Sequence, residues 1–121
     1  MKVLCVSSNK KLKIDAFKAK NGYEFVMARQ GNGLLEKIEE ESPDLILLYV
    51  DKQCNGVSIL KEQHPDIPLL VVSDEKEIER KIDCLEQGAD SYIHSSIISE
   101  KLFMKIKALV RSYEWQRMRC I

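Results

Sequence analysis

The 121-residue chain lacks an excess of charge of either sign, because nineteen basic residues balance nineteen acidic ones. Bulk charge therefore points neither to a nucleic-acid partner nor to a membrane surface. No apolar run reaches the length of a membrane span, and Met1 and Lys2 lead directly into a short apolar segment instead of a signal peptide. With 45% hydrophobic and 31% charged residues, the chain is expected to form one globular domain in the cytoplasm.

Paired metal-ligand spacings are also missing. His64 and His94 have no carboxylate or cysteine at ligand spacing. Cys5 and Cys84 fall at apolar positions, where buried thiols are common. The sequence therefore predicts no metal, no cofactor and a reduced protein without disulfides.

Short apolar runs alternate with helical patterns along the whole chain. We expect strands over residues 3–6, 23–28, 45–50, 69–72 and 91–93. Helices are expected over about 10–20, from 34 to before Pro43, over 56–63, from 78 to Gly88 and from 102 onward, through Trp115. Strands that alternate with helices indicate parallel pairing with right-handed crossovers. The predicted fold class is α/β, a doubly wound five-stranded parallel sheet with helices on both faces.

Several of these segments resemble the receiver domain of two-component response regulators. The matching stretches are "GYEFVMA", "PDLILL", "PDIPLLVVSD" and "EQGADSYI". The resemblance covers residues 2–111 and implies a flavodoxin-like sheet of strand order 2-1-3-4-5. Residues 112–121 are expected to form either an extension of the last helix or the start of a linker.

The resemblance also implies a pocket that has lost its chemistry. In that family an aspartate after the third strand accepts a phosphoryl group, an acidic pair after the first strand holds Mg²⁺, and a lysine follows the fifth strand. In this sequence the corresponding positions carry hydroxyl residues: Ser7, Ser8, Tyr49 and Ser95. The switch-like hydroxyl and aromatic positions fall on Ser73 and Tyr92. The expected pocket is degenerate, with no catalytic residue.

Tyr49 stands where the acceptor aspartate is expected. Two interpretations are open: its ring fills the vacated pocket with its hydroxyl bonded to a serine or water, or it is a half-exposed packing residue. Asp51 is an alternative acceptor on the same face of the strand, but its carboxylate lies about 6–7 Å further out.

Charge is divided between the last two helices. The helix from 78 to Gly88 carries the acidic residues Glu79, Asp83 and Glu86 beside Arg80. The last helix carries basic residues, among them Lys105 and Arg111. Solvated faces are the ordinary meaning of such charge. In the resembling family, however, the fourth helix, fifth strand and fifth helix form a face that dimerises or docks partners. We therefore expect a homodimer through a face that includes Arg80, Asp83, Lys101, Lys105 and Arg111.

The leading hypothesis is a phosphorylation-independent regulatory and dimerisation module. The stretch "MKIKALVRS" resembles the last helix of the winged-helix branch of the family, which implies the N-terminal part of a transcriptional regulator. Its DNA-binding effector domain would lie outside this chain, and this domain would contact neither nucleic acid nor membrane. Two alternatives stay open: a pseudo-receiver that senses a small neutral ligand, and a residual phosphoacceptor that uses Asp51.

Overall fold

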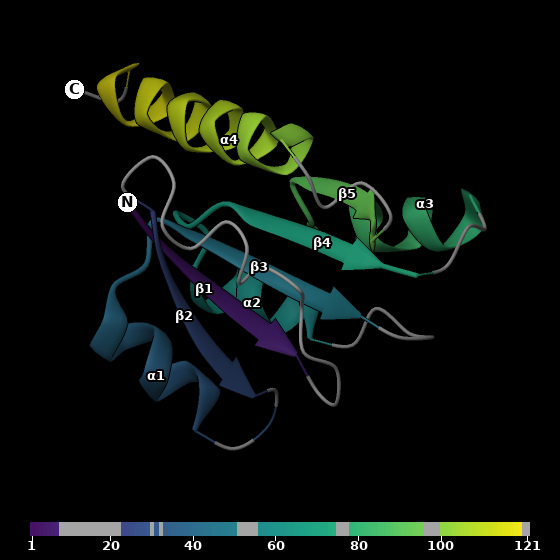
Figure 1. Ribbon diagram of the computed structural model, residues 1–121, viewed down its shortest axis with the longest axis horizontal. Coiled ribbons are helices and arrows are strands. Elements are labelled where there is room, and N and C mark those ends of the chain that lie inside the picture. Colours follow the sequence, from purple (N-terminus) through teal and green to yellow (C-terminus); the bar gives the residue numbers. More distant parts are fainter. Residues whose placement is uncertain are drawn as a thin grey trace.

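The computed structural model describes residues 1–7, 23–29, 31, 33–50, 56–74, 78–95 and 100–119. Its strands form a five-stranded parallel sheet of order β2-β1-β3-β4-β5, with helices on both faces (Figure 1). The elements are β1 (Lys2–Ser7), β2 (Glu24–Arg29), α1 (Leu34–Glu41), β3 (Leu45–Val50), α2 (Val57–Gln63), β4 (Leu69–Ser73), α3 (Ile78–Glu86), β5 (Ser91–His94) and α4 (Glu100–Arg119). The predicted fold class and strand order are confirmed.

The predicted elements agree with these bounds to within a few residues, with two qualifications. The helix expected over 10–20 lies outside the described residues. The last helix continues to Arg119, so the predicted extension is, over residues 112–119, the final part of α4. No helix in the described part of the chain combines the length and apolar character that a membrane span requires.

Side chains of the central strand β3 are buried on both faces of the sheet. Leu45, Leu47 and Tyr49 belong to the hydrophobic cluster under α4, whereas Ile46 and Leu48 belong to the cluster that includes residues from α1, α2 and α3. Continuous apolar sequence replaces alternation because helices cover both faces. Burial of each such side chain contributes about 1.5–3 kcal/mol, so any shift of β3 that exposes them is costly.

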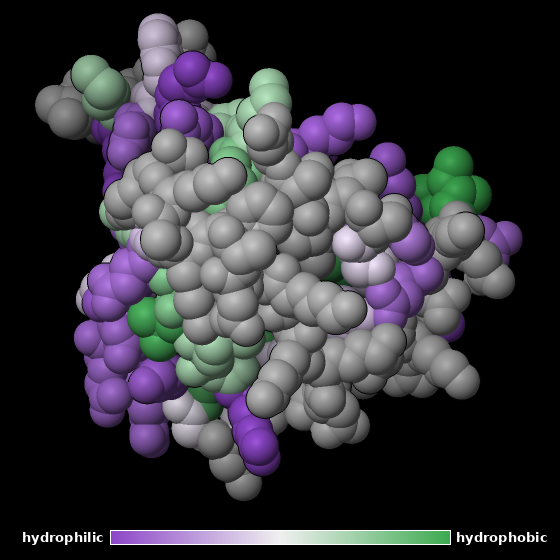
Figure 2. All heavy atoms as spheres, in the orientation of Figure 1, coloured by the Kyte–Doolittle hydropathy of each residue, from purple (hydrophilic) through white to green (hydrophobic). Residues whose placement is uncertain are grey.

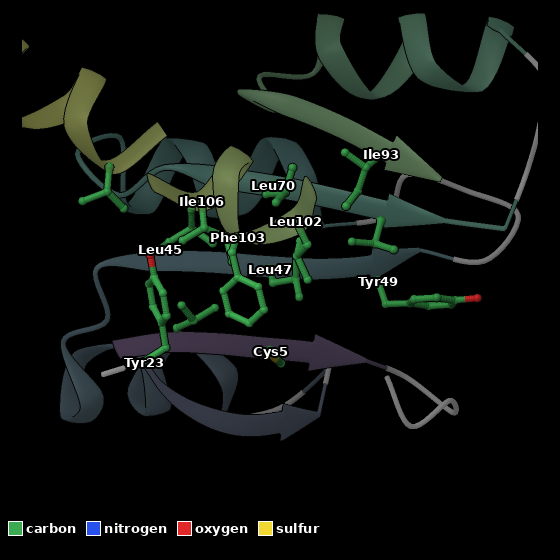
Figure 3. Packing of buried hydrophobic residues seen from close by; sticks show 13 residues of the cluster. Cys5, Tyr23, Leu45, Leu47, Tyr49, Leu70, Ile93, Leu102, Phe103 and Ile106 are labelled. Atoms are coloured by element: carbon green, nitrogen blue, oxygen red, sulfur yellow. The ribbon is translucent and has the colours of Figure 1, made fainter. Parts of the chain in front are cut away.

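Aromatic rings hold α4 on the sheet. Leu102, Phe103 and Ile106 of α4 point toward the strands (Figure 3). The ring centroid of Phe103 lies 5.2 Å from that of Tyr23 and 6.1 Å from that of Phe25. These contacts place α4 beside β1 and β2 as well as over β3.

The two described cysteines differ in state. Cys5, buried in β1, is not disulfide-bonded. Cys84, buried on α3, is disulfide-bonded. The prediction of a chain without disulfides is therefore wrong at Cys84.

A polar cluster fastens the C-terminal part of α4 to the end of the sheet where β4 and β5 begin. Lys61 Nζ lies 3.1 Å from Asp90 Oδ2 and 2.6 Å from the hydroxyl oxygen of Tyr113. The Tyr113 hydroxyl donates to Asp90 Oδ1 at 2.6 Å, and the Leu69 N–H donates to Asp90 Oδ2 at 2.8 Å. We call Lys61, Asp90 and Tyr113 the Lys61 clasp.

Two neighbouring features support the Lys61 clasp. Gly88 has φ +114°, and a Cβ there would lie 3.2 Å from Lys61 Cγ, so glycine leaves room for the lysine stem. Arg117, one turn beyond Tyr113 on α4, donates from its guanidinium to the carbonyl oxygen of Asp66 at 3.0 Å. The end of α4 is thus bound to the domain at two points.

The Lys61 clasp makes stability sensitive to high pH. Burial, followed by the hydrogen bond to Asp90, raises the pKa of Tyr113. The unfolded chain ionises its tyrosines near pH 10, while the folded chain keeps Tyr113 protonated there. The contribution is therefore complete below about pH 10 and is lost as the pH rises further.

We expect Tyr113→Phe to lower the free energy of unfolding at pH 7 by about 1–3 kcal/mol, because it removes two hydroxyl hydrogen bonds. Between pH 9 and pH 11, the free energy of unfolding should also fall less in the variant than in the wild-type protein. Urea unfolding across this range measures both effects. Tyr23→Phe, which removes the hydroxyl of a buried tyrosine outside the Lys61 clasp, is the matched control; an equal loss in both variants at pH 7 would contradict the assignment.

Candidate functional site

The C-terminal ends of β3, β4 and β5 meet through one carboxylate. Asp74 follows directly after β4. The Tyr49 hydroxyl at the end of β3 donates to Asp74 Oδ2, and the Ser95 hydroxyl after β5 donates to Asp74 Oδ1. Nε2 of His94 lies 2.9 Å from the carbonyl oxygen of Asp74. We call Tyr49, Asp74, His94 and Ser95 the Asp74 hub.

Strand pairing explains why these residues meet. Tyr49 is paired with Val72 in the register of β3 and β4, and Ser73 is paired with His94 in that of β4 and β5. Residues that follow these pairs leave the sheet at the same edge. In open α/β sheets this edge is where ligands and chemistry are usually placed.

Tyr49 is only 4% exposed, so the interpretation as a half-exposed residue is wrong. Its ring extends the cluster formed by Leu47 and Ile93, with the hydroxyl directed away from that cluster (Figure 3). The hydroxyl donates to the Asp74 carboxylate, a partner that the sequence interpretation did not consider. The available signal was that Asp74 ends the matching stretch "PDIPLLVVSD" on the strand next to β3.

The other predicted pocket residues occupy different positions. Ser7 ends β1 and is 7% exposed, and alternation along β1 places it on the same face of the sheet as Cys5 and Tyr49. Ser73 ends β4 and is 1% exposed. Tyr92 of β5 packs against the cluster on the opposite face from Tyr49. Ser8 and Asp51 lie outside the described residues.

The chemistry available at the Asp74 hub is hydrogen bonding by hydroxyl groups to one carboxylate. Both Asp74 oxygens accept hydrogen bonds from side chains of the domain. Hydroxyl groups are poor substitutes for paired carboxylates around Mg²⁺. The part of the chain that the structure describes has no group of three or more His, Cys, Asp or Glu residues that could hold a metal ion.

The surface formed by α3, β5 and α4 corresponds to the predicted dimer face. Asp83, Lys101, Lys105 and Arg111 are exposed there, whereas Arg80 is half-buried. A groove of about 440 Å³ lies between β5 and α4. It is lined by Asp90, Ser91, Lys101, Met104, Lys105, Ala108 and Leu109.

The apolar stripe of α3 faces outward. The helix is amphipathic as predicted, but Ile78, Ile82 and Leu85 are 69%, 48% and 37% exposed. Hydrophobic atoms reach the surface over α3, at the right-hand edge of the view in Figure 2. Among the residues of α3 only Cys84 is buried. An apolar stripe of this kind commonly marks an interaction site.

A comparison with protein-family models shows the family to which the chain belongs. Residues 7–107 match the model of the response regulator receiver domain. The chain belongs to this family. The resemblance noted in the sequence is therefore confirmed, and the described chain is a receiver domain of two-component signalling.

Curated relatives include response regulators and transcriptional regulatory proteins. The receiver domain is 31% identical over 99 residues to the alkaline phosphatase synthesis transcriptional regulatory protein PhoP of Bacillus subtilis, covering 78% of this chain and 41% of that protein. It is 30% identical over 95 residues to the response regulator MprA of Mycobacterium leprae, covering 75% and 42%. The chain thus spans about two fifths of the length of these relatives.

Solved structures share the fold. An atypical orphan response regulator, described as having a phosphorylation-independent regulatory mechanism, superposes with a TM-score of 0.77 at 28% identity, over 92% of this chain and 96% of that one. NtrX of Brucella abortus superposes with a TM-score of 0.80 at 19% identity, over 98% of this chain and 28% of that one. The second likeness shows the fold alone.

The two parts of the Tyr49 side chain should contribute unequally to stability. Tyr49→Phe removes the donor to the Asp74 carboxylate and keeps the ring, so we expect a loss of about 1.5–3 kcal/mol in the free energy of unfolding. Tyr49→Ala also leaves a cavity and should cost about 3–5 kcal/mol. Urea unfolding of both variants measures the difference; equal losses would show that the ring is not packed as described.

Proposed function

We propose that this receiver domain is a phosphorylation-independent regulatory and dimerisation module of a cytoplasmic transcriptional regulator. The observation that carries the proposal is Tyr49 at the end of β3, buried and hydrogen-bonded to Asp74. A phenol cannot form the acyl phosphate that a carboxylate nucleophile forms. The proposal treats Ser7, Ser8, Tyr49 and Ser95 as a degenerate phosphorylation pocket, with Ser73 and Tyr92 at the switch positions.

Two comparisons support this role. The solved atypical orphan response regulator is described as regulated independently of phosphorylation. PhoP and MprA are more than twice as long as the region that matches this chain, and PhoP is a transcriptional regulatory protein. We place the receiver domain at residues 2–111, with 112–121 leading toward an effector domain that binds DNA. The receiver domain itself then contacts proteins, not nucleic acid.

The surface of α3, β5 and α4 supplies the proposed dimer contact. The exposed stripe of α3 carries Ile82 beside Asp83, whereas the groove beside α4 carries Met104 beside Lys101 and Lys105. In a dimer with a two-fold axis, the acidic and apolar surface of α3 in each copy contacts the basic and apolar groove of the other copy. The same contact therefore forms twice. Apolar contact provides most of the affinity, and the charges orient the encounter.

Absence of phosphoryl transfer is tested directly. We expect no increase in intact mass by one phosphoryl group when the protein is incubated with acetyl phosphate and Mg²⁺, while a receiver domain that retains the acceptor aspartate is modified under the same conditions. A modification that disappears in Asp51→Asn would identify Asp51 as a residual acceptor and overturn the proposal.

Self-association is tested by exchanging charges. In sedimentation experiments without a phosphoryl donor, Lys105→Glu and Asp83→Lys should each weaken dimerisation by about tenfold at low salt, and the double variant should recover most of the loss. Association should also weaken as salt rises, because exposed ion pairs are screened.

Lys107→Glu is the matched control, since Lys107 is an exposed lysine of α4 that does not line the groove. An equal loss in this control would mean that only net charge matters. Monomeric protein at high concentration would contradict the dimer and leave the mass experiment unaffected.

A further inference from the structure

Asp74 connects the C-terminal ends of three neighbouring strands of the sheet. Asp74 directly follows β4. Its Oδ2 accepts a hydrogen bond from the Tyr49 hydroxyl near the end of β3, and its Oδ1 accepts one from the Ser95 hydroxyl just after β5. Its carbonyl oxygen also lies within hydrogen-bonding distance of His94. A single residue thus bonds to the ends of both neighbouring strands.

The connected segments lead to the two helices of the proposed dimer face. The chain runs from Asp74 to α3, which starts at Ile78, and from Ser95 to α4, which starts at Glu100. The strand β5 between these helices ends at His94, another member of the Asp74 hub. The Asp74 hub therefore lies where the chain leaves the sheet toward both helices of that face.

The two hydroxyl groups suit an acceptor that has two oxygens. Tyr49 and Ser95 donate to different oxygens of the carboxylate. Hydrogen bonds to an ionised acceptor are about twice as strong as bonds between neutral groups. An amide of the same shape offers one oxygen and one NH₂ group, so one hydroxyl would have to turn and accept from the NH₂ group, and both hydrogen bonds would lose the contribution of the negative charge.

We propose that the Asp74 carboxylate is a built-in anion that holds the ends of β3, β4 and β5 together and thereby fixes the α3–β5–α4 surface. This inference rests on the proposed phosphorylation-independent function, because it supplies within the chain a negative charge that no phosphoryl donor has to deliver. Asp74 acts as a positioning residue: it sets the geometry of the surface through Tyr49 and Ser95 and does not itself contact a partner.

Hydrogen exchange of the full chain tests the inference. In Asp74→Asn and Asp74→Ala, the backbone amides of Val72, Ser73, Ile93 and His94 should exchange about tenfold faster than in the wild-type protein. Formate, the smallest carboxylate, should restore most of the protection in Asp74→Ala by occupying the space between Tyr49 and Ser95. It should not restore protection when Ser95→Ala and Tyr49→Phe are added to Asp74→Ala.

Glu62→Gln is the matched control, because it removes one negative charge from an exposed position on α2. This variant should exchange like the wild-type protein with or without formate. Wild-type protection in Asp74→Asn would show that the charge is not required, and a failure of formate to restore Asp74→Ala would show that an anion does not fill this place. Either result overturns the inference.

The experiment separates this inference from the proposed function. Exchange at β4 and β5 is measured on monomer or dimer and needs no phosphoryl donor, so its outcome does not depend on self-association or on the mass experiment. If exchange responds as expected while the protein stays monomeric, the built-in anion stands and the homodimer fails.

Discussion

The burial of β3 between two layers of helices is the constraint on which the other features depend. All six residues of this strand are buried. Its side chains alternate between two hydrophobic clusters, and a shift by one residue would move each of them to the wrong cluster. The strand therefore delivers Tyr49 to the edge of the sheet in a fixed position, with the ring in one cluster and the hydroxyl beside Asp74. The chemistry that the site can perform therefore depends on the residue type at position 49.

The fold was predictable from the sequence because the buried strands are apolar without interruption and the intervening segments have helical spacing. The run from Leu45 to Val50 gave the bounds of β3 correctly. The site was predictable in part: positions such as Tyr49 and Ser95 follow from the family pattern. Asp74 was missed because the family pattern gives it no role, although it ends a matching stretch; its contacts with Tyr49 and Ser95 follow from the pairing of β4 with β3 and β5.

The exposed stripe of α3 shows the limit of periodicity as evidence. Spacing of Ile78, Ile82 and Leu85 indicates which residues share a face of a helix, but it does not indicate which face meets the sheet. In the structure the small residue Cys84 makes the buried contact, and the larger apolar side chains face outward. A helix that looks like an ordinary core helix in the sequence therefore exposes its hydrophobic side, and the dimer proposal uses this exposed side.

The Lys61 clasp has a mechanical consequence for anything attached after α4. Tyr113 and Arg117 are four residues apart, about 6 Å along the helix axis, and each is bound to the domain. One attachment would allow the helix to swing about that point, whereas two attachments on the same side resist both swing and roll. The direction of the end of α4 is therefore tied to that of the sheet, so any segment that continued this helix would leave the receiver domain in a set direction.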